Sequence, residues 1–105
     1  MIDPLDGTTN FLHNLPIYAV SIGLRKNNKT ICGVVYNPAA NKCFYSEYKK
    51  GSFLNDVIIK PTSCNTLSES LLVTGFPYVK DNKYDESFNI FKEFYDNSRG
   101  MRRLG

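Results

Sequence analysis

The chain has 105 residues and a formal net charge of +3, and 42% of its residues are hydrophobic, which allows one domain at most, with little surplus core. No stretch approaches the roughly 20 apolar residues of a membrane-spanning helix, and the N-terminus has acids where a secretory signal has a basic start. The adjacent pairs Lys49-Lys50 and Arg102-Arg103 fall short of a dense basic stripe. We therefore expect a cytoplasmic protein with neither a membrane nor a nucleic-acid partner.

The first predicted element is a strand end that turns into a short helix. Pro4 has a fixed φ and pushes Asp3 into an extended conformation, so the Asp3 carboxylate should leave the end of a strand in a defined direction. Thr8 or Thr9 is a good N-cap for a short helix that runs to His13.

The same segment carries the groups of a metal and phosphate site. Mg²⁺ prefers oxygen ligands and is usually held by one or two carboxylates together with substrate phosphate and water. Asp3, Asp6 and the backbone carbonyl of Leu5 supply such oxygens. Gly7 can adopt turn conformations that other residues avoid, and the N–H groups at a helix start bind phosphate. Because an ordinary solvated turn has the same Asp-Pro-x-Asp-Gly pattern, residues 3–7 alone leave both interpretations open.

A run of strands follows, and its short connections predict an antiparallel meander. Large and small side chains alternate from Ile17 to Leu24, which is typical of a strand with one bulky and one close-packing face. The turn at 26–29 ends this strand. The further predicted strands are Thr30 to Tyr36, Cys43 to Tyr48, Ser52 to Leu54 and Val57 to Ile59.

The last third of the chain predicts a strand from Leu71 to Val73, a helix capped by Asp81 or Asn82, and a strand that starts within Met101 to Leu104. Aromatic residues at helical spacing predict a helix face that packs on the sheet: Tyr84, Phe88, Phe91 and Tyr95. Three widely spaced cysteines, far from the single His, indicate neither a disulfide framework nor a zinc site: Cys32, Cys43 and Cys64. No composition shift marks a linker, so we expect no internal domain boundary.

The segment from Asp3 to Phe11 resembles the inositol monophosphatase family. It matches the metal- and phosphate-binding signature of that family, Asp-Pro-[Leu/Ile/Val]-Asp-Gly-Thr-Thr-Asn-Phe, at every position. Sugar bisphosphatases more often have Asp-Gly-Ser in this loop, and bisphosphate nucleotidases typically have Lys after the first Thr. Further segments resemble the family in the same order and extend the similarity over essentially the whole chain: Leu12-His13, Pro16, 19–22, 33–36 with Pro38, 51–55, 74–78 and 102–105.

The resemblance implies a fold and an activity. The fold is α+β, an antiparallel sheet with packed helices that is a fragment of the layered αβαβα sugar-phosphatase fold, and residues 1–105 are the central part of a single domain. The activity is that of a Mg²⁺-dependent phosphomonoesterase, which hydrolyses the small-molecule phosphate ester inositol monophosphate. The full-length protein is expected to be a homodimer.

The resemblance also assigns roles to the residues of the signature. Asp3 bridges metals, Asp6 and the Leu5 carbonyl complete the metal coordination, and Asp6 also contacts substrate. The Thr8 hydroxyl orients the attacking water, which makes Asp3 and Thr8 the expected catalytic residues. The expected phosphate-binding residues are Gly7, Thr8 and Thr9.

Members of that family are considerably longer, and two parts of their metal site have no counterpart in this sequence. These are an upstream set of Glu residues and a downstream Trp-Asp-x-Ala-Ala-Gly segment. We therefore expect a central fragment, truncated at both ends and inactive alone. The alternatives are a fructose-1,6-bisphosphatase or bisphosphate nucleotidase of the same superfamily and, from another class, a non-catalytic truncated product.

Overall fold

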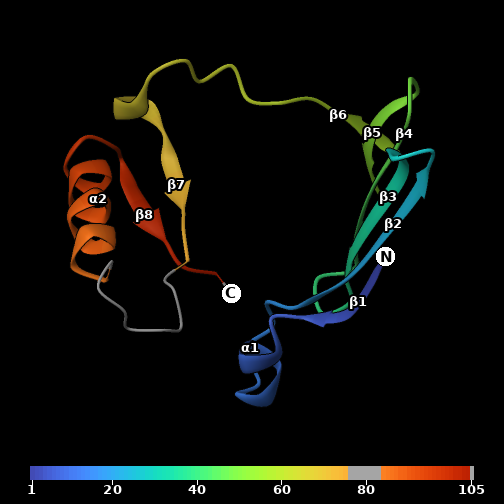
Figure 1. Ribbon diagram of the computed structural model, residues 1–105, viewed down its shortest axis with the longest axis horizontal. Helices are drawn as coiled ribbons and strands as arrows, with labels where there is room; N and C mark the ends of the chain where they lie inside the picture. The colour runs from blue at the N-terminus through green and yellow to red at the C-terminus, as the bar shows by residue number, and fades with distance from the viewer. Residues whose placement is uncertain (76–83, 105) are drawn as a thin grey trace. The chain divides into compact units, whose positions relative to one another are not determined.

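The computed structural model describes residues 1–75 and 84–104, which belong to two compact units (Figure 1). Unit 1 comprises residues 1–61 and unit 2 comprises residues 62–104. The sequence signal for this division is weak, because residues 61–66, Pro-Thr-Ser-Cys-Asn-Thr, are mostly polar but contain neither glycine nor charge. None of the helices in the described ranges has the length and apolar character needed to cross a membrane.

Unit 1 is a six-stranded antiparallel sheet in which each strand pairs with the next along the chain, as the predicted meander requires. The predicted strands are all present, although β2 begins and ends two residues later than its pattern indicated. The strands in spatial order are β1 (Ile2–Asp6), β2 (Ala19–Lys26), β3 (Lys29–Asn37), β4 (Lys42–Glu47), β5 (Gly51–Leu54) and β6 (Val57–Ile59).

Two hairpins of this sheet close through pairs of residues with positive φ. Asn27 and Asn28 have φ values of 49° and 61°, and Asn55 and Asp56 have values of 46° and 67°. Positive φ at both central residues is the signature of the type I′ turn, whose twist matches that of the flanking strands. Asn and Asp enter this region more readily than other side chains. The local sequence therefore sets these turns, and the turns set the strand register.

Unit 2 contains the short helix η1 (Leu67–Glu69) and two parallel strands, β7 (Leu71–Val73) and β8 (Gly100–Arg102). The helix α2 (Tyr84–Asp96) lies between these strands in the sequence. Parallel strands need a long crossover connection, which is commonly helical, and α2 provides it here. The strand and helix predictions are confirmed, but the predicted cap at Asp81 or Asn82 lies outside the described residues.

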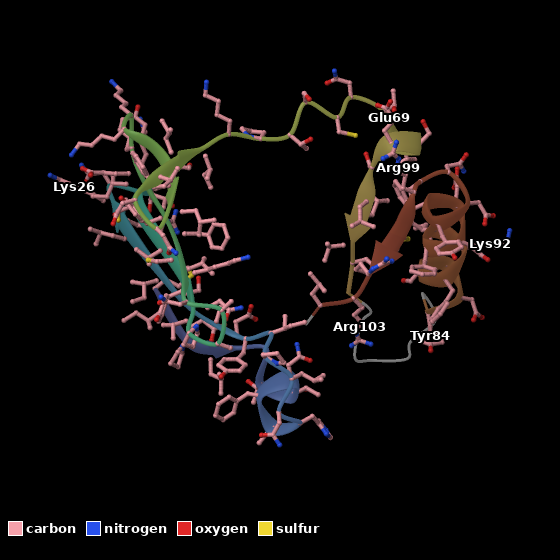
Figure 2. The ribbon with its side chains drawn as sticks, turned by 180° about the vertical axis from the view of Figure 1, so that it is seen from behind. Lys26, Glu69, Tyr84, Lys92, Arg99 and Arg103 are labelled. Carbon is pink, nitrogen blue, oxygen red and sulfur yellow. The ribbon has the colours of Figure 1, made fainter. Side chains whose placement is uncertain are left out.

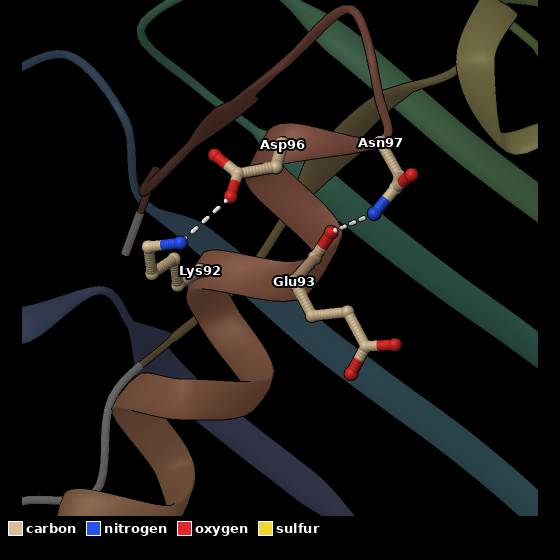
Figure 3. A network of polar contacts seen from close by, with 4 residues as sticks. All are labelled: Lys92, Glu93, Asp96 and Asn97. Carbon is tan, nitrogen blue, oxygen red and sulfur yellow. Dashed lines mark hydrogen bonds and ion pairs between the residues drawn. The ribbon is translucent and has the colours of Figure 1, made fainter.

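The last turn of α2 is closed by its own side chains (Figure 3). Lys92 Nζ forms an ion pair with Asp96 Oδ2 at 3.0 Å, and Asn97 Nδ2 donates to the Glu93 carbonyl at 2.8 Å. Carbonyls in the last turn of a helix have no intrahelical partner. Asn97 therefore acts as a local C-terminal cap.

The aromatic stripe of α2 differs in part from its prediction. Its rings pair along the helix, with centroids 4.8 Å apart for Tyr84 and Phe88 and 6.1 Å apart for Phe91 and Tyr95. Phe88 remains 40% exposed and Tyr95 remains 55% exposed. The stripe is therefore only partly covered, and its rings also contact one another along the helix.

No hydrophobic side chain among the described residues is buried. Ile22, Leu24 and Val35 of unit 1 are between 42% and 56% exposed. A shallow hollow of about 460 Å³ lies on the sheet and is lined by apolar groups that include Val34, Phe44 and Phe53. Ile22 is opposite Val34, so Val35 lies on the other face, and unit 1 leaves apolar side chains uncovered on both faces of its sheet. This agrees with the expectation of a small core.

Candidate functional site

Asp3 and Asp6 lie on β1, an edge strand whose pairing with β2 is irregular. Asp3 is opposite Ser21 and Asp6 is opposite Ala19, so three steps along β1 correspond to two steps along β2. The irregularity surrounds Pro4, which has no N–H to give to the ladder. One strand therefore carries an extra residue, which is the definition of a β-bulge.

The bulge decides where the two carboxylates point. In a regular strand, residues three apart face opposite sides of the sheet. Ser21 and Ala19 are two residues apart on β2 and share one face, and directly opposed residues in an antiparallel pair also share a face. Asp3 and Asp6 therefore lie on the same face of the sheet. The bulge thus brings both carboxylates to one face, where a single site could use them.

Two hydrogen bonds within the loop fix its oxygen atoms. The Leu5 amide donates to Asp3 Oδ1 at 3.2 Å, and Thr8 Oγ1 donates to the Leu5 carbonyl at 2.9 Å. Each of these acceptor groups keeps further lone pairs for another partner. The Asp3 carboxylate and the Leu5 carbonyl are therefore held in place by the loop while they remain able to coordinate a cation.

Gly7, rather than a threonine, precedes the first residue of the helix α1 (Thr8–Leu12). The N-cap is Gly7, with φ of +82°, and no side chain caps the helix. The predicted cap at Thr8 or Thr9 is therefore wrong, because the Thr8 hydroxyl is used by the Leu5 carbonyl. The first intrahelical bond runs from the Phe11 amide to the Gly7 carbonyl at 3.0 Å. The amides of Thr8 and Thr9 precede this bond, so the helix itself gives them no acceptor.

The loop is also held by contacts with Ile17 and Tyr18, which the sequence alone did not predict. A Cβ on Gly7 would stand 2.9 Å from the Ile17 carbonyl oxygen and 3.2 Å from Tyr18 Cα. Asn10 Nδ2 donates to the same Ile17 carbonyl at 2.8 Å, and the rings of Phe11 and Tyr18 meet edge to face at 5.1 Å. The Asn and Phe of the signature are therefore anchoring residues, and their presence in the motif was the available signal.

The predicted site residues are brought together on one exposed loop. Asp3, Asp6, Thr8 and Thr9 are exposed, and Leu5 and Gly7 are partly buried. The available donors are two carboxylates and one carbonyl, all of them oxygens, which suits a hard cation such as Mg²⁺. Within residues 1–75 and 84–104, no group of three or more His, Cys, Asp or Glu side chains gathers in a way that would hold a metal. The loop therefore offers a partial coordination shell.

His13 lies apart from these donors as the C-cap of α1, where its side chain is exposed. Cys32, Cys43 and Cys64 are partly buried thiols. Cys64 Sγ lies 3.3 Å from Ser70 Oγ in unit 2. None of these residues belongs to the loop of Asp3 and Asp6.

Comparison with known proteins shows that the whole chain is similar to one protein family. A family model described as the inositol monophosphatase family matches residues 1–105. The chain is 41% identical over 104 residues to an inositol-1-monophosphatase from Synechocystis sp., a match that covers 99% of this chain and 36% of that protein. It is 37% identical over 105 residues to a Haemophilus influenzae protein named Nus factor SuhB, covering 100% of this chain and 39% of that protein.

The fold is also that of a solved relative. The crystal structure of extragenic suppressor protein suhB from Bartonella henselae matches with a TM-score of 0.93 and 36% identity, over 99% of this chain and 40% of that chain. This match confirms the predicted fold class, an antiparallel sheet with helices that forms part of the larger phosphatase fold. The chain spans at most 40% of the length of these relatives.

Proposed function

Because this chain belongs to the inositol monophosphatase family, we propose that it supplies the catalytic loop of a Mg²⁺-dependent phosphomonoesterase that acts on inositol monophosphate. The proposal applies to a polypeptide of the length of the relatives. One observation carries it: the bulge in β1 turns Asp3 and Asp6 to the same face, beside a Leu5 carbonyl that the Thr8 hydroxyl holds.

In this proposal the three oxygen donors of the loop hold the metal. Asp3 offers two carboxylate oxygens and would be the bridging ligand, while Asp6 and the Leu5 carbonyl would supply further oxygen ligands. The bond from the Leu5 amide keeps the Asp3 side chain oriented before any metal arrives. Bound Mg²⁺ would lower the pKa of a water nucleophile and offset the charge on the leaving oxygen.

The Thr8 hydroxyl has a role defined by its hydrogen bond. Its proton is directed to the Leu5 carbonyl at 2.9 Å. Toward a water molecule, Thr8 Oγ1 can therefore act only as an acceptor. Such an acceptor would hold one O–H of the attacking water and so restrict how its lone pairs face the phosphate.

The backbone amides of the loop take the phosphate oxygens in the same proposal. The amides of Thr8 and Thr9 lie before the first hydrogen bond of α1, and the Gly7 amide belongs to the same turn. The helix has five residues, so individual N–H groups rather than a helix dipole make the contact. In this proposal Asp6 also contacts the substrate.

The experiment uses a hybrid protein in which residues 1–105 replace the matching segment of the Synechocystis inositol-1-monophosphatase. Asp3→Asn removes the negative charge but keeps an Oδ1 acceptor for the Leu5 amide. We expect Mg²⁺-dependent kcat/KM for inositol 1-phosphate to fall by at least about a hundredfold, which corresponds to about 2.7 kcal/mol of transition-state stabilisation.

Asp56→Asn is the matched control, because it neutralises an exposed Asp of the same sheet and keeps the Oδ1 acceptor for Tyr45. Its activity should stay within a factor of a few of the parent hybrid. Similar activities for the Asp3 and Asp56 variants, in proteins with equal circular dichroism spectra, would refute the metal-bridging role. Extending the reading frame in the source DNA and assaying its product on inositol 1-phosphate, fructose 1,6-bisphosphate and a nucleoside 3′,5′-bisphosphate would decide the substrate.

A further inference from the structure

The net positive charge of this chain lies entirely in unit 1. Residues 1–61 contain seven Lys or Arg and four Asp or Glu, an excess of three that equals the net charge of the whole chain. No Asp or Glu occurs between positions 7 and 46. A third adjacent basic pair, Arg25-Lys26, adds to the two pairs considered from the sequence.

The strand register gathers this charge at one end of the sheet. Lys26 pairs directly with Lys29 across β2 and β3. The turn between β4 and β5 lies at the same end, because Cys32 of β3 pairs with Glu47. Figure 2 shows Lys26 at the end of unit 1 away from α1.

The final strand adds one more basic residue to this end. Ile59 of β6 pairs with Ser52, so Lys60 follows at the level of the β4–β5 turn. Six of the seven basic residues of unit 1 therefore share one end of the sheet. This basic end consists of Arg25, Lys26, Lys29, Lys49, Lys50 and Lys60.

The basic end is poorly neutralised. Its one acidic residue, Glu47, forms an ion pair with Lys50 at 2.8 Å. Lys26 and Lys29 stand opposite each other, and like charges in directly opposed positions destabilise a sheet. Lys49 is in the left-handed region with φ of 65°, which a non-glycine residue seldom adopts. The fold therefore tolerates repulsion and backbone strain here, and an anionic ligand would relieve the repulsion.

An exposed aromatic ring accompanies these cations. Tyr48 is 60% exposed, and Lys49 Nζ lies 5.3 Å from its ring centroid. Beside it lies an open hollow of about 430 Å³, lined by Thr30, Tyr48, Lys49 and Ser52 among others. A flat ring next to a hollow can receive a planar ligand group by stacking.

We propose that the basic end binds single-stranded nucleic acid, with its cations on successive phosphates and Tyr48 stacked on a base. The cations extend from β2 to β6, four strand spacings of about 4.8 Å each, or about 19 Å in all. That span suits a polymer with repeated charges better than a single phosphate. Basic grooves combined with stacking aromatic rings are the usual means of binding single strands. This proposal replaces the expectation of no nucleic-acid partner, which considered only basic residues that are adjacent in the sequence.

The test measures fluorescence anisotropy of labelled oligouridylate and oligothymidylate of about 20 nucleotides, longer than the usual site of one binding fold. It uses the hybrid protein with the Synechocystis enzyme as its reference, because the 105-residue chain alone exposes apolar faces and is expected to associate. Six phosphate contacts predict that log K falls with log salt concentration with a slope of about −4.

One set of variants removes charge from the basic end, and another removes equal charge elsewhere. Lys26→Gln, Lys29→Gln and Lys49→Gln combined should reduce the steepness of the salt dependence by about 2, since each single-strand phosphate contact contributes about 0.7. The control combines Lys42→Gln, Lys92→Gln and Arg102→Gln and should leave the slope unchanged. Both sets should leave phosphatase activity of the hybrid intact.

Variants of Tyr48 distinguish binding of nucleic acid from binding of other polyanions. Tyr48→Leu should weaken oligonucleotide binding about tenfold, while Tyr48→Phe should retain it, because stacking needs only an aromatic ring. The RNA and DNA arms should agree, since phosphate contacts and stacking are common to both. The proposal is overturned if neither oligonucleotide binds saturably, or if the two sets of charge variants give the same salt dependence. It is also overturned if an acidic peptide or an anionic vesicle competes as well as the oligonucleotide and its competition is unchanged by Tyr48→Leu.

Discussion

Gly7→Ala should destabilise the loop because Gly7 is constrained twice. Its φ of +82° lies in the left-handed region, where a residue with a Cβ loses about 1–2 kcal/mol. The added Cβ would also stand 2.9 Å from the Ile17 carbonyl oxygen and 3.2 Å from Tyr18 Cα. Both neighbours are backbone atoms, so the contact cannot be relieved by a side-chain rotation.

The consequence of that contact follows from the role of Ile17. Its carbonyl must move, and the same carbonyl accepts the Asn10 side chain at 2.8 Å. Overpacking costs about 1–3 kcal/mol, and a lost neutral hydrogen bond costs about 1 kcal/mol. We expect a total loss of about 3–6 kcal/mol for Gly7→Ala.

Gly51→Ala is the matched control in the same sheet. Gly51 also has positive φ, at +100°, but a Cβ there would meet only Ile58 Cδ1 at 3.8 Å. Its expected loss is therefore the conformational part alone, about 1–2 kcal/mol. Urea denaturation of the hybrid protein, followed by circular dichroism, gives both values from the shift in midpoint at constant slope. If Gly7→Ala cost no more than Gly51→Ala, the proposed contact with Ile17 would not constrain the loop.

Three further predictions follow from the loop, the uncovered sheet and a tyrosine. In the hybrid protein, Thr8→Val should lower kcat more than it raises KM, because the hydroxyl acts on the water rather than on bound substrate; Thr8→Ser should keep most activity, and a change in KM alone would contradict the water-orienting role. The 105-residue chain alone should release no phosphate in a Mg²⁺-dependent assay and should aggregate or melt with low cooperativity, since it exposes apolar faces; robust turnover by a monodisperse sample would show that the residues present suffice. The pKa of Tyr45 is raised above 10.0, chiefly because its neutral hydroxyl donates to Asp56 at 2.8 Å. The contribution of this bond to folding stability is therefore complete below pH 10.0 and is lost as the pH rises through the folded-state pKa. Tyr45→Phe should therefore flatten the alkaline loss of stability in denaturation measured across that range, and an unchanged pH profile would contradict this linkage.

The sequence by itself determined the local features of this protein. Alternating side chains predicted the strands because strand periodicity depends only on neighbours along the chain. The turn at Asn27 was recognisable because Asn accepts positive φ. The signature from Asp3 to Phe11 indicated the site chemistry, since carboxylates, a carbonyl and a glycine turn carry that chemistry in their own atoms.

The tertiary structure decided the features that depend on pairing between distant residues. Asp3 and Asp6 would face opposite sides of a regular strand, and only their register with Ser21 and Ala19 places both on one face. The contact between Gly7 and the Ile17 carbonyl likewise joins two segments that come together only on folding.

The basic end has the same origin. Its cations come from the β2–β3 and β4–β5 turns and from the end of β6, and they share one end of the sheet because of the strand register. A turn fixes the register of the two strands that it joins, but the level of one turn relative to another depends on pairing across the whole sheet, which no single segment shows. The chain thus encoded the chemical groups locally, and strand pairing determined which of those groups act together.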